Sequence, residues 1–281
     1  MLNVTRVIRS SNLWIAIFCG IVTGFVACAL FAEWLAPQDP FRQNLLGRLK
    51  PPGTEARDVT YLLGSDELGR DLLSRLIYGA RVSLFVAIVA VIATALVGTT
   101  LGMAAAYLGG RTEIAIMRVA DAILSIPALL FAVIIVAILG PGLTNVIIVL
   151  ALTRWPRYAR VAHAQTLSIM NMHYVRLARY MGASWPYIIG RHILPNIAST
   201  IIVVATLEFG IMVLFEAGLS FLGFGVQAPT PSWGAMLAIG RDYIENAWWL
   251  ATFPGLCLFL LVMSGNVLGD HLRDRLDPRL K

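Results

Sequence analysis

Charged residues are scarce in this chain, and their scarcity indicates the solvent in which the protein folds. Only 14% of its 281 residues are charged and 58% are hydrophobic, whereas a soluble domain has about a quarter charged residues and is about half apolar. The excess apolar residues form long runs rather than an alternating pattern. Such runs are typical of helices surrounded by lipid, so the sequence predicts an integral membrane protein.

The sequence also lacks the usual patterns of an enzyme. It has no Gly-rich phosphate-binding loop, no His/Cys cluster with metal-ligand spacing and no Ser/His/Asp set. Its three cysteines lie inside apolar runs without disulfide or metal spacing, and its net charge of +6 is too diffuse to favour nucleic acid. We therefore predict no catalytic site, no metal, no directly bound cofactor and no nucleic-acid partner. Any ATP hydrolysis would belong to a separate chain.

Six apolar segments are candidates for crossing the bilayer, which predicts an all-α fold with six transmembrane helices. The first is too long for a signal peptide and has no cleavage site, so it is expected to remain as a helix. The fourth is short and is expected to continue through Trp155 and Pro156, with arginines reaching toward the interface. Pro127 and Pro254 are expected to kink their helices. The six segments are Leu13–Leu35, Val82–Tyr107, Val119–Leu139, Leu143–Thr153, Ile197–Leu222 and Trp248–Leu268.

The distribution of Lys and Arg between these segments predicts their orientation. Segments 1–12, 109–118, 154–195 and 269–281 hold two, two, six and four basic residues. The short turns on the other side hold only Arg241, and the long external segment balances its basic residues with acids. The positive-inside rule then places both termini in the cytoplasm. Three parts follow: residues 1–35 with the first helix, 36–81 outside, and 82–281 as a five-helix core.

The external part ends in residues 64–81, GSDELGRDLLSRLIYGAR, which resemble a capped amphipathic helix. Ser65 or Asp66 can cap it, and its leucines fall on one face. We expect this helix to lie on the outer membrane surface and lead into the second span. Two i,i+4 ion pairs would support it: Asp66–Arg70 and Asp71–Arg75.

The cytoplasmic loop 164–195 has a defined shape. Six arginines and no acid lie between Arg154 and Arg191, but topology alone requires only their charge. Residues 171–181 suit a short helix that Gly182 can end, because glycine readily adopts positive φ. Ser184 suits an N-cap, Pro186 a first helical turn, and Pro195 a stop before the fifth span. The pattern predicts a compact knob that docks to another protein.

Two acids lie within the fifth span, where an ionised group is costly. Glu208 and Glu216 are eight residues apart, which places them roughly 80° apart around a helix. They could line the solute path or its gate and meet an ammonium group or a cation. Alternatively, Glu216 could lie near the outer interface and pair with an arginine of a partner subunit. Asp121 is expected at an interface near Arg118.

The knob resembles a loop found in permeases of binding-protein-dependent ABC importers, where the pattern is E-A-A-x-x-x-G, nine residues, then I-x-L-P. Gly182 and the Leu194-Pro195 pair have this spacing, with His192 at the isoleucine position. Ala178 matches the second alanine, whereas Arg176 and Leu177 replace the Glu and the first alanine. A salt bridge made through that Glu is therefore not carried over.

Further stretches resemble the C-type permease of dipeptide, oligopeptide and nickel importers. They are GSDELGRDLLSRLIYGARVSL at 64–84, LSFLGFGVQAPTPSWGAML at 219–237 and GDHLRDRLDPRLK at 269–281. The resemblance implies the type I ABC importer permease fold, with the knob as a coupling helix that docks to an ATPase. The implied coupling residues are Arg176, Ala178, Arg179, Gly182, Ala183, Ser184, Leu194 and Pro195. The residues that carry the external resemblance are Gly64, Asp66, Gly69, Arg70, Asp71 and Arg75.

The implied protein is half of a translocation path in a bacterial inner membrane. Its partners would be a second homologous permease, two ATP-binding subunits that use ATP and Mg, and an extracytoplasmic solute-binding protein. Dipeptides or oligopeptides are the expected solutes, with nickel, glutathione or another small solute as alternatives. An ion-coupled secondary transporter with Asp121, Glu208 and Glu216 as ion sites is a different reading. Such transporters usually have more spans and inverted repeats, and we find no repeat here.

Overall fold

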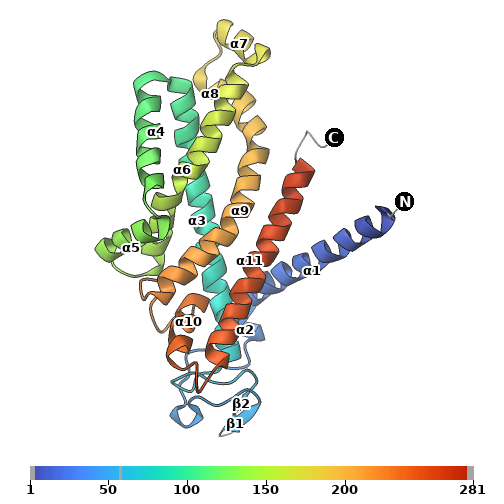
Figure 1. Cartoon of the computed structure of the whole chain (residues 1–281), viewed down its shortest axis with the longest axis vertical. Helices are drawn as coiled ribbons and strands as arrows, with labels where there is room; N and C mark the ends of the chain where they lie inside the picture. The colour runs from blue at the N-terminus through green and yellow to red at the C-terminus, as the bar shows by residue number, and fades with distance from the viewer. Residues whose placement is uncertain (1–3, 57–58, 277–281) are drawn as a thin grey trace.

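The computed structural model of the chain describes residues 4–56 and 59–276, and its long elements are helices (Figure 1). One end of the bundle carries α7 and α8, the opposite end carries the β1–β2 hairpin, and the start of α1 lies out to one side (Figure 1). The elements in the first half are α1 (Val4–Leu30), α2 (Ala32–Leu35), η1 (Leu45–Gly47), β1 (Thr54–Ala56), β2 (Val59–Tyr61), α3 (Leu72–Leu108), α4 (Gly110–Ser125) and α5 (Ala128–Leu139). The second half holds α6 (Leu143–Met170), α7 (His173–Tyr180), α8 (Trp185–Ile188), η2 (Ile189–Ile193), α9 (Leu194–Phe221), α10 (Trp233–Asp242) and α11 (Trp249–Leu276).

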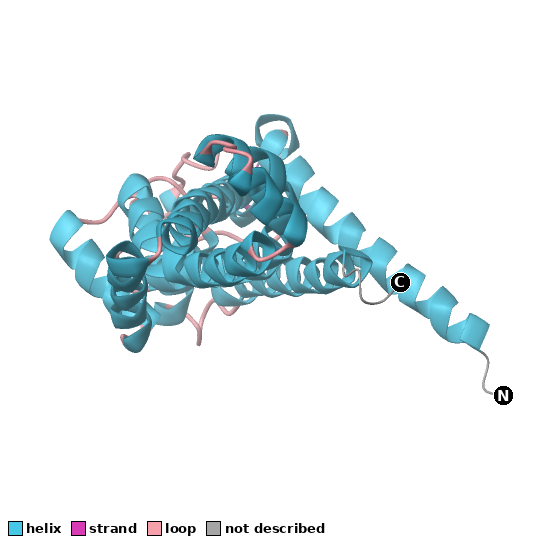
Figure 2. Ribbon diagram, turned by 90° about the horizontal axis from the view of Figure 1, so that it is seen from above, coloured by secondary structure: helices cyan, strands magenta, loops and turns pink. Residues whose placement is uncertain are grey.

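The bundle is built around α3, which packs most extensively against α6 and also contacts α9 and α1. Gly98 and Gly102 on α3 allow this close approach, because a Cβ at either position would collide with a backbone carbonyl of α6. Small residues four positions apart commonly let membrane helices approach in this way. Seen from above, α1 diverges from the bundle toward its N-terminal end (Figure 2).

The helix expected over 64–81 is formed only from Leu72 onward, and as the first turns of α3 rather than as a separate surface helix. Its N-cap is Asp71, whose side chain accepts a hydrogen bond from the Ser74 amide, so neither Ser65 nor Asp66 caps it. The Asp66–Arg70 ion pair is present, with 2.6 Å between Nε and Oδ2. The pair expected between Asp71 and Arg75 is replaced by an Arg75–Asp66 contact at 3.4 Å.

Within the described residues, three helical segments are long and apolar enough to span a membrane: Leu72–Leu108, Trp185–Phe221 and Trp249–Arg275. The pair α4 and α5 passes the same test together, but it bends by 97° at the break before Ala128. Pro127 lies at this break, in agreement with the kink predicted there. The predicted total of six spans is not confirmed by these lengths and stays a prediction.

Three prolines lie within or near the start of long helices: Pro156 in α6, Pro195 in α9 and Pro254 in α11. Pro156 lies inside α6, which continues to Met170 as expected for the fourth span. Pro195 lies in the first turn of α9 and does not end the preceding element, contrary to the prediction. The chain passes from α8 to α9 through the π-helical turn η2, where the Leu194 amide donates to the Ile189 carbonyl five residues earlier. This wider turn accommodates a residue that has no N–H to donate.

Candidate functional site

The knob consists of α7, the turn after it, and α8. Gly182 has φ +84°, and two hydrogen bonds close the end of α7. The Ala183 amide donates to the Ala178 carbonyl at 3.0 Å and the Gly182 amide donates to the Arg179 carbonyl at 3.1 Å. This pair of bonds is the Schellman arrangement that a glycine in the left-handed region permits. The predicted helix end at Gly182 is therefore confirmed.

The next helix begins as the sequence indicates, with one difference. Ser184 is the N-cap residue of α8 with extended backbone angles, and Pro186 lies in the first turn. The Ser184 side chain makes no capping hydrogen bond. The proline and the tight turn therefore fix where α8 begins.

The exposed surface of α7 has an apolar face. Tyr174, Leu177 and Met181 are 45%, 60% and 80% exposed, and their i, i+3, i+7 spacing places them on one side. Val175 lies on the opposite side, is 3% exposed and packs toward the bundle. An exposed apolar face on a charged knob is the feature expected of a docking surface.

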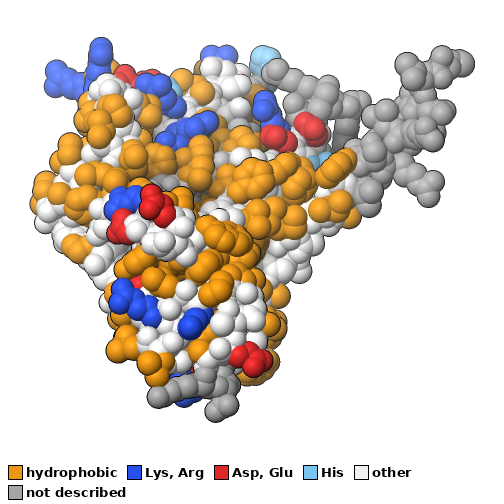
Figure 3. All heavy atoms as spheres, turned by 60° about the horizontal axis from the view of Figure 1, so that its bottom comes forward, with side chains coloured by type: hydrophobic (Ala, Val, Ile, Leu, Met, Phe, Trp, Pro, Cys, Tyr) orange, Lys and Arg blue, Asp and Glu red, His pale blue; other side chains and the backbone are white. Residues whose placement is uncertain are grey.

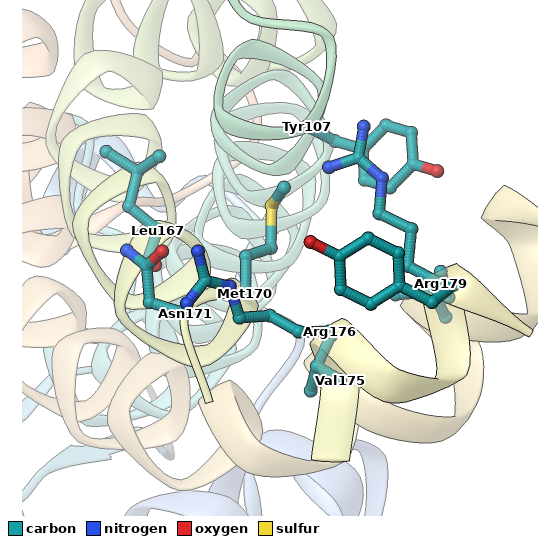
Figure 4. Close-up of a pocket in the computed structure, with 9 residues that line it drawn as sticks. Tyr107, Leu167, Met170, Asn171, Val175, Arg176 and Arg179 are labelled. Carbon is teal, nitrogen blue, oxygen red and sulfur yellow. The ribbon is translucent and has the colours of Figure 1, made fainter. Parts of the chain in front are cut away.

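A cavity of about 570 Å³ lies between α7 and the ends of α3 and α6 (Figure 4). The guanidinium of Arg176 points toward Asn171, and that of Arg179 lies over the Tyr107 ring at 5.9 Å (Figure 4). Arg176 and Arg179, predicted as coupling residues, therefore both line a cavity at the base of the knob. The lining residues are Tyr107, Leu167, Met170, Asn171, Val175, Arg176, Arg179, Tyr180 and Ile188.

Glu208 is fully buried and forms an ion-pair cluster with α6. Arg154 donates to both of its carboxylate oxygens at 2.8 and 2.9 Å, and Arg157 Nη1 lies 3.0 Å from Oε1. The arginines of this helix were predicted to reach toward the interface. The Arg154 side chain instead lies within the bundle and is only 13% exposed. Arg157 is about half exposed. Glu208 thus joins α9 to α6 deep in the bundle.

Glu216 has a different environment, composed of hydroxyl groups. Ser83 on α3 and Ser220 on α9 donate to its carboxylate at 3.1 and 2.8 Å. Ser232, the N-cap of α10, contacts Ser220 in turn. In the described part of the chain no cation pairs with Glu216, and its role in a solute path or at a partner interface stays a prediction.

The charges of α6 are matched by acids on other helices. Arg160 pairs with Asp121 on α4 at 2.5 Å, so Arg160 takes the place predicted for Arg118. His163 Nε2 lies 2.8 Å from Glu113, also on α4. The acids missing from the sequence near these basic residues are thus supplied by helices that pack beside them.

Sequence reasoning missed the Arg154–Glu208 pair, although a signal for it existed. Glu208 lies 14 residues into α9 from the knob, and Arg154 lies 16 residues into α6 from the same end. At 1.5 Å per residue these positions have similar depths of about 20–25 Å. An acid inside a span needs a partner, and Arg154 and Arg157 are the basic residues near that depth.

The opposite end of the molecule holds a second charged cluster with aromatic anchors. Trp249 Nε1 donates to the Ser65 carbonyl at 3.2 Å, and Trp233 Nε1 donates to the Leu76 carbonyl at 2.9 Å. Burial raises the pKa of the Glu67 carboxyl, and the adjacent Asp66 carboxylate adds to this effect. The face viewed from this end is largely hydrophobic with a few charged patches (Figure 3). The stretch 64–81 is therefore joined by hydrogen bonds to α10 and α11 at this end of the molecule.

Long apolar helices around a buried ion-pair cluster, with a shaped knob at one end, are the architecture of an integral membrane protein. The family described as "Binding-protein-dependent transport system inner membrane component" matches residues 98–281, and the chain belongs to it. The chain is 48% identical to the di/tripeptide transport system permease protein DppC of Pseudomonas aeruginosa over 91% of this chain and 85% of that protein. It is 40% identical to the glutathione transport system permease protein GsiD of Pectobacterium atrosepticum over 95% of this chain and 88% of that protein.

A solved structure supports the fold independently of close sequence similarity. The methionine ABC transporter MetNI, in an inward-facing conformation, matches with a TM-score of 0.59 at 20% identity. The match covers 73% of this chain and 98% of the transporter chain. The predicted type I permease fold is confirmed.

Proposed function

We propose that this chain pairs with a homologous permease and two ATP-binding subunits to import short peptides delivered by an extracytoplasmic solute-binding protein. The ATP and Mg would be used by the ATP-binding subunits. The knob formed by α7 and α8 would lie in the cytoplasm, and so would both termini. The chain itself would carry no catalytic site.

The observation that carries this proposal is the knob's exposed apolar face. Tyr174, Leu177 and Met181 are held outward on a helix whose end is fixed by Gly182. A face of this kind can couple the conformations of two subunits. A contact that differs between two conformational states shifts the equilibrium between them. The same family membership and the basic residues around the knob support a cytoplasmic position.

The names of the relatives support small peptides as the solute class of this permease. The Pseudomonas protein is named for di- and tripeptides and the Pectobacterium protein for glutathione, itself a small peptide. We infer that this permease also moves small peptides. In such a system the solute-binding protein would contribute much of the selection.

The docking role can be tested at Gly182. Gly182→Arg should abolish co-purification of the ATP-binding subunits and leave membrane insertion intact, because φ +84° is strained for a side chain. Gly182→Asn is the matched control, since asparagine tolerates the left-handed region, and it should retain assembly. Retained assembly and transport in the arginine variant would contradict the docking role.

The energy source separates this proposal from an ion-coupled transporter. In cells or proteoliposomes, peptide uptake should stop when ATP is depleted and should survive an uncoupler while ATP is maintained. Uptake that collapses with the uncoupler and ignores ATP depletion would refute the proposal. Variants of Asp121, Glu208 and Glu216 would then be tested as ion sites.

A further inference from the structure

The cavity at the base of the knob contains two arginines without acidic partners. In the part of the chain that the structure describes, neither Arg176 nor Arg179 forms an ion pair, whereas Arg154, Arg157 and Arg160 on α6 all do. The sequence has no acidic residue from 122 to 207. Among the described residues, those that line this cavity therefore carry positive charge and include no acid.

The lining groups are chemically suited to an oxyanion. Arg176 and Arg179 are three residues apart on α7 and both line the cavity, with the Arg176 guanidinium toward Asn171 and the Arg179 guanidinium over the Tyr107 ring (Figure 4). A guanidinium group donates paired N–H groups in a fork that fits phosphate oxygens. The Asn171 amide lies on the same wall, and the Tyr107 ring supports Arg179 by a cation–π contact.

The cavity's position favours a ligand at the membrane surface. Tyr107 is next to the last residue of α3, and Met170 is the last residue of α6, so the cavity opens where both long helices end. Leu108, beside Tyr107, is 61% exposed. Basic pockets between transmembrane helices at the cytoplasmic surface commonly bind anionic lipid head groups.

We propose that this cavity binds a phosphoryl group through Arg176 and Arg179, either that of an anionic lipid head group or free phosphate. This site goes beyond the proposed transport function, and it differs from the docking face formed by Tyr174, Leu177 and Met181. A bound phosphoryl group would neutralise the two guanidinium groups and brace α7 against α3 and α6.

The test uses the complete transporter complex purified in detergent, with wild-type chain, Arg176→Gln/Arg179→Gln, and Arg191→Gln as matched control. Arg191 lies on η2, directly after the knob, and does not line the cavity. In one arm, native mass spectrometry measures binding of phosphatidylglycerol against phosphatidylcholine. In the other arm, thermal unfolding is followed with inorganic phosphate against chloride at equal ionic strength.

The proposal expects a phosphoryl preference that the double variant weakens about tenfold or more, the effect of losing one charge-assisted hydrogen bond. The Arg191 variant should behave as wild type. Selective retention of phosphatidylglycerol identifies a lipid head group, and stabilisation by phosphate alone identifies free phosphate. Equal binding by the double variant, or no preference in either arm, overturns the proposal. Loss of the ATP-binding subunits from the double variant without any anion effect also overturns it, because an acidic group of a partner would then fill the cavity.

Discussion

Removing the Glu208 carboxylate should destabilise the protein more than any other single charge deletion in α6 or α9. Glu208 is fully buried, and Arg154 donates to both of its oxygens. In Glu208→Leu the Arg154 guanidinium keeps its position with 13% exposure and loses its counter-charge. Breaking one side of a buried ion pair costs about 3–5 kcal/mol, because an uncompensated charge stays buried.

A double-mutant cycle gives this prediction its sharpest form. Arg154→Met should also destabilise, because it leaves Glu208 with only the half-exposed Arg157. The double variant Arg154→Met/Glu208→Leu should recover most of the loss, since an apolar replacement of a buried pair is often neutral or stabilising. We expect a coupling free energy of about 2–3 kcal/mol, at the upper end of the range for contacting residues.

The assay is the free energy of unfolding of the purified chain, measured by titration with SDS in mixed micelles and followed by tryptophan fluorescence. Arg160→Gln serves as control, because its pair with Asp121 is about half exposed on both sides and should change stability by less than about 1 kcal/mol. Single variants that unfold like wild type would refute the reasoning. A double variant as unstable as Glu208→Leu would refute it equally.

Two further predictions concern packing and pH. Gly98→Ala should lower the free energy of unfolding by about 1–3 kcal/mol, because the added methyl group overpacks the α3–α6 contact. Gly24→Ala is the control, because its added Cβ meets open space, and it should have no such effect. The measurements are the amount of each variant in the membrane and its unfolding, and equal behaviour of the two variants would contradict the prediction. Burial raises the pKa of Glu67 in the folded state, so its charged form opposes folding, and stability falls as pH rises through that pKa. Glu67→Gln should therefore be more stable than wild type at neutral pH, with an advantage that disappears on acidification; an advantage that grows on acidification would reverse the sign.

Much of the knob could be predicted because its signals are local. Gly182 ends α7 through its own backbone angle, and Pro186 begins α8 through its fixed φ. The prediction that Pro195 stops the helix before the fifth span was wrong, because the sequence does not show that a π-helical turn precedes this proline. Helix starts depend on similar detail: only the structure shows that Asp71, rather than Ser65 or Asp66, caps α3.

The sequence by itself determined that the chain lies in a membrane, that its basic knob has a defined shape, and which family it resembles. These conclusions rest on composition, on runs of apolar residues and on turn residues whose effects reach only a few positions. Only the tertiary structure decided that Arg154 pairs with Glu208, and that Arg176 and Arg179 face a cavity while Leu177 faces outward. Those facts depend on which helices are neighbours and on the depth and rotation of each. A buried charge pairs with a residue that is close in the folded structure but distant in the sequence. Local sequence patterns do not encode such a contact.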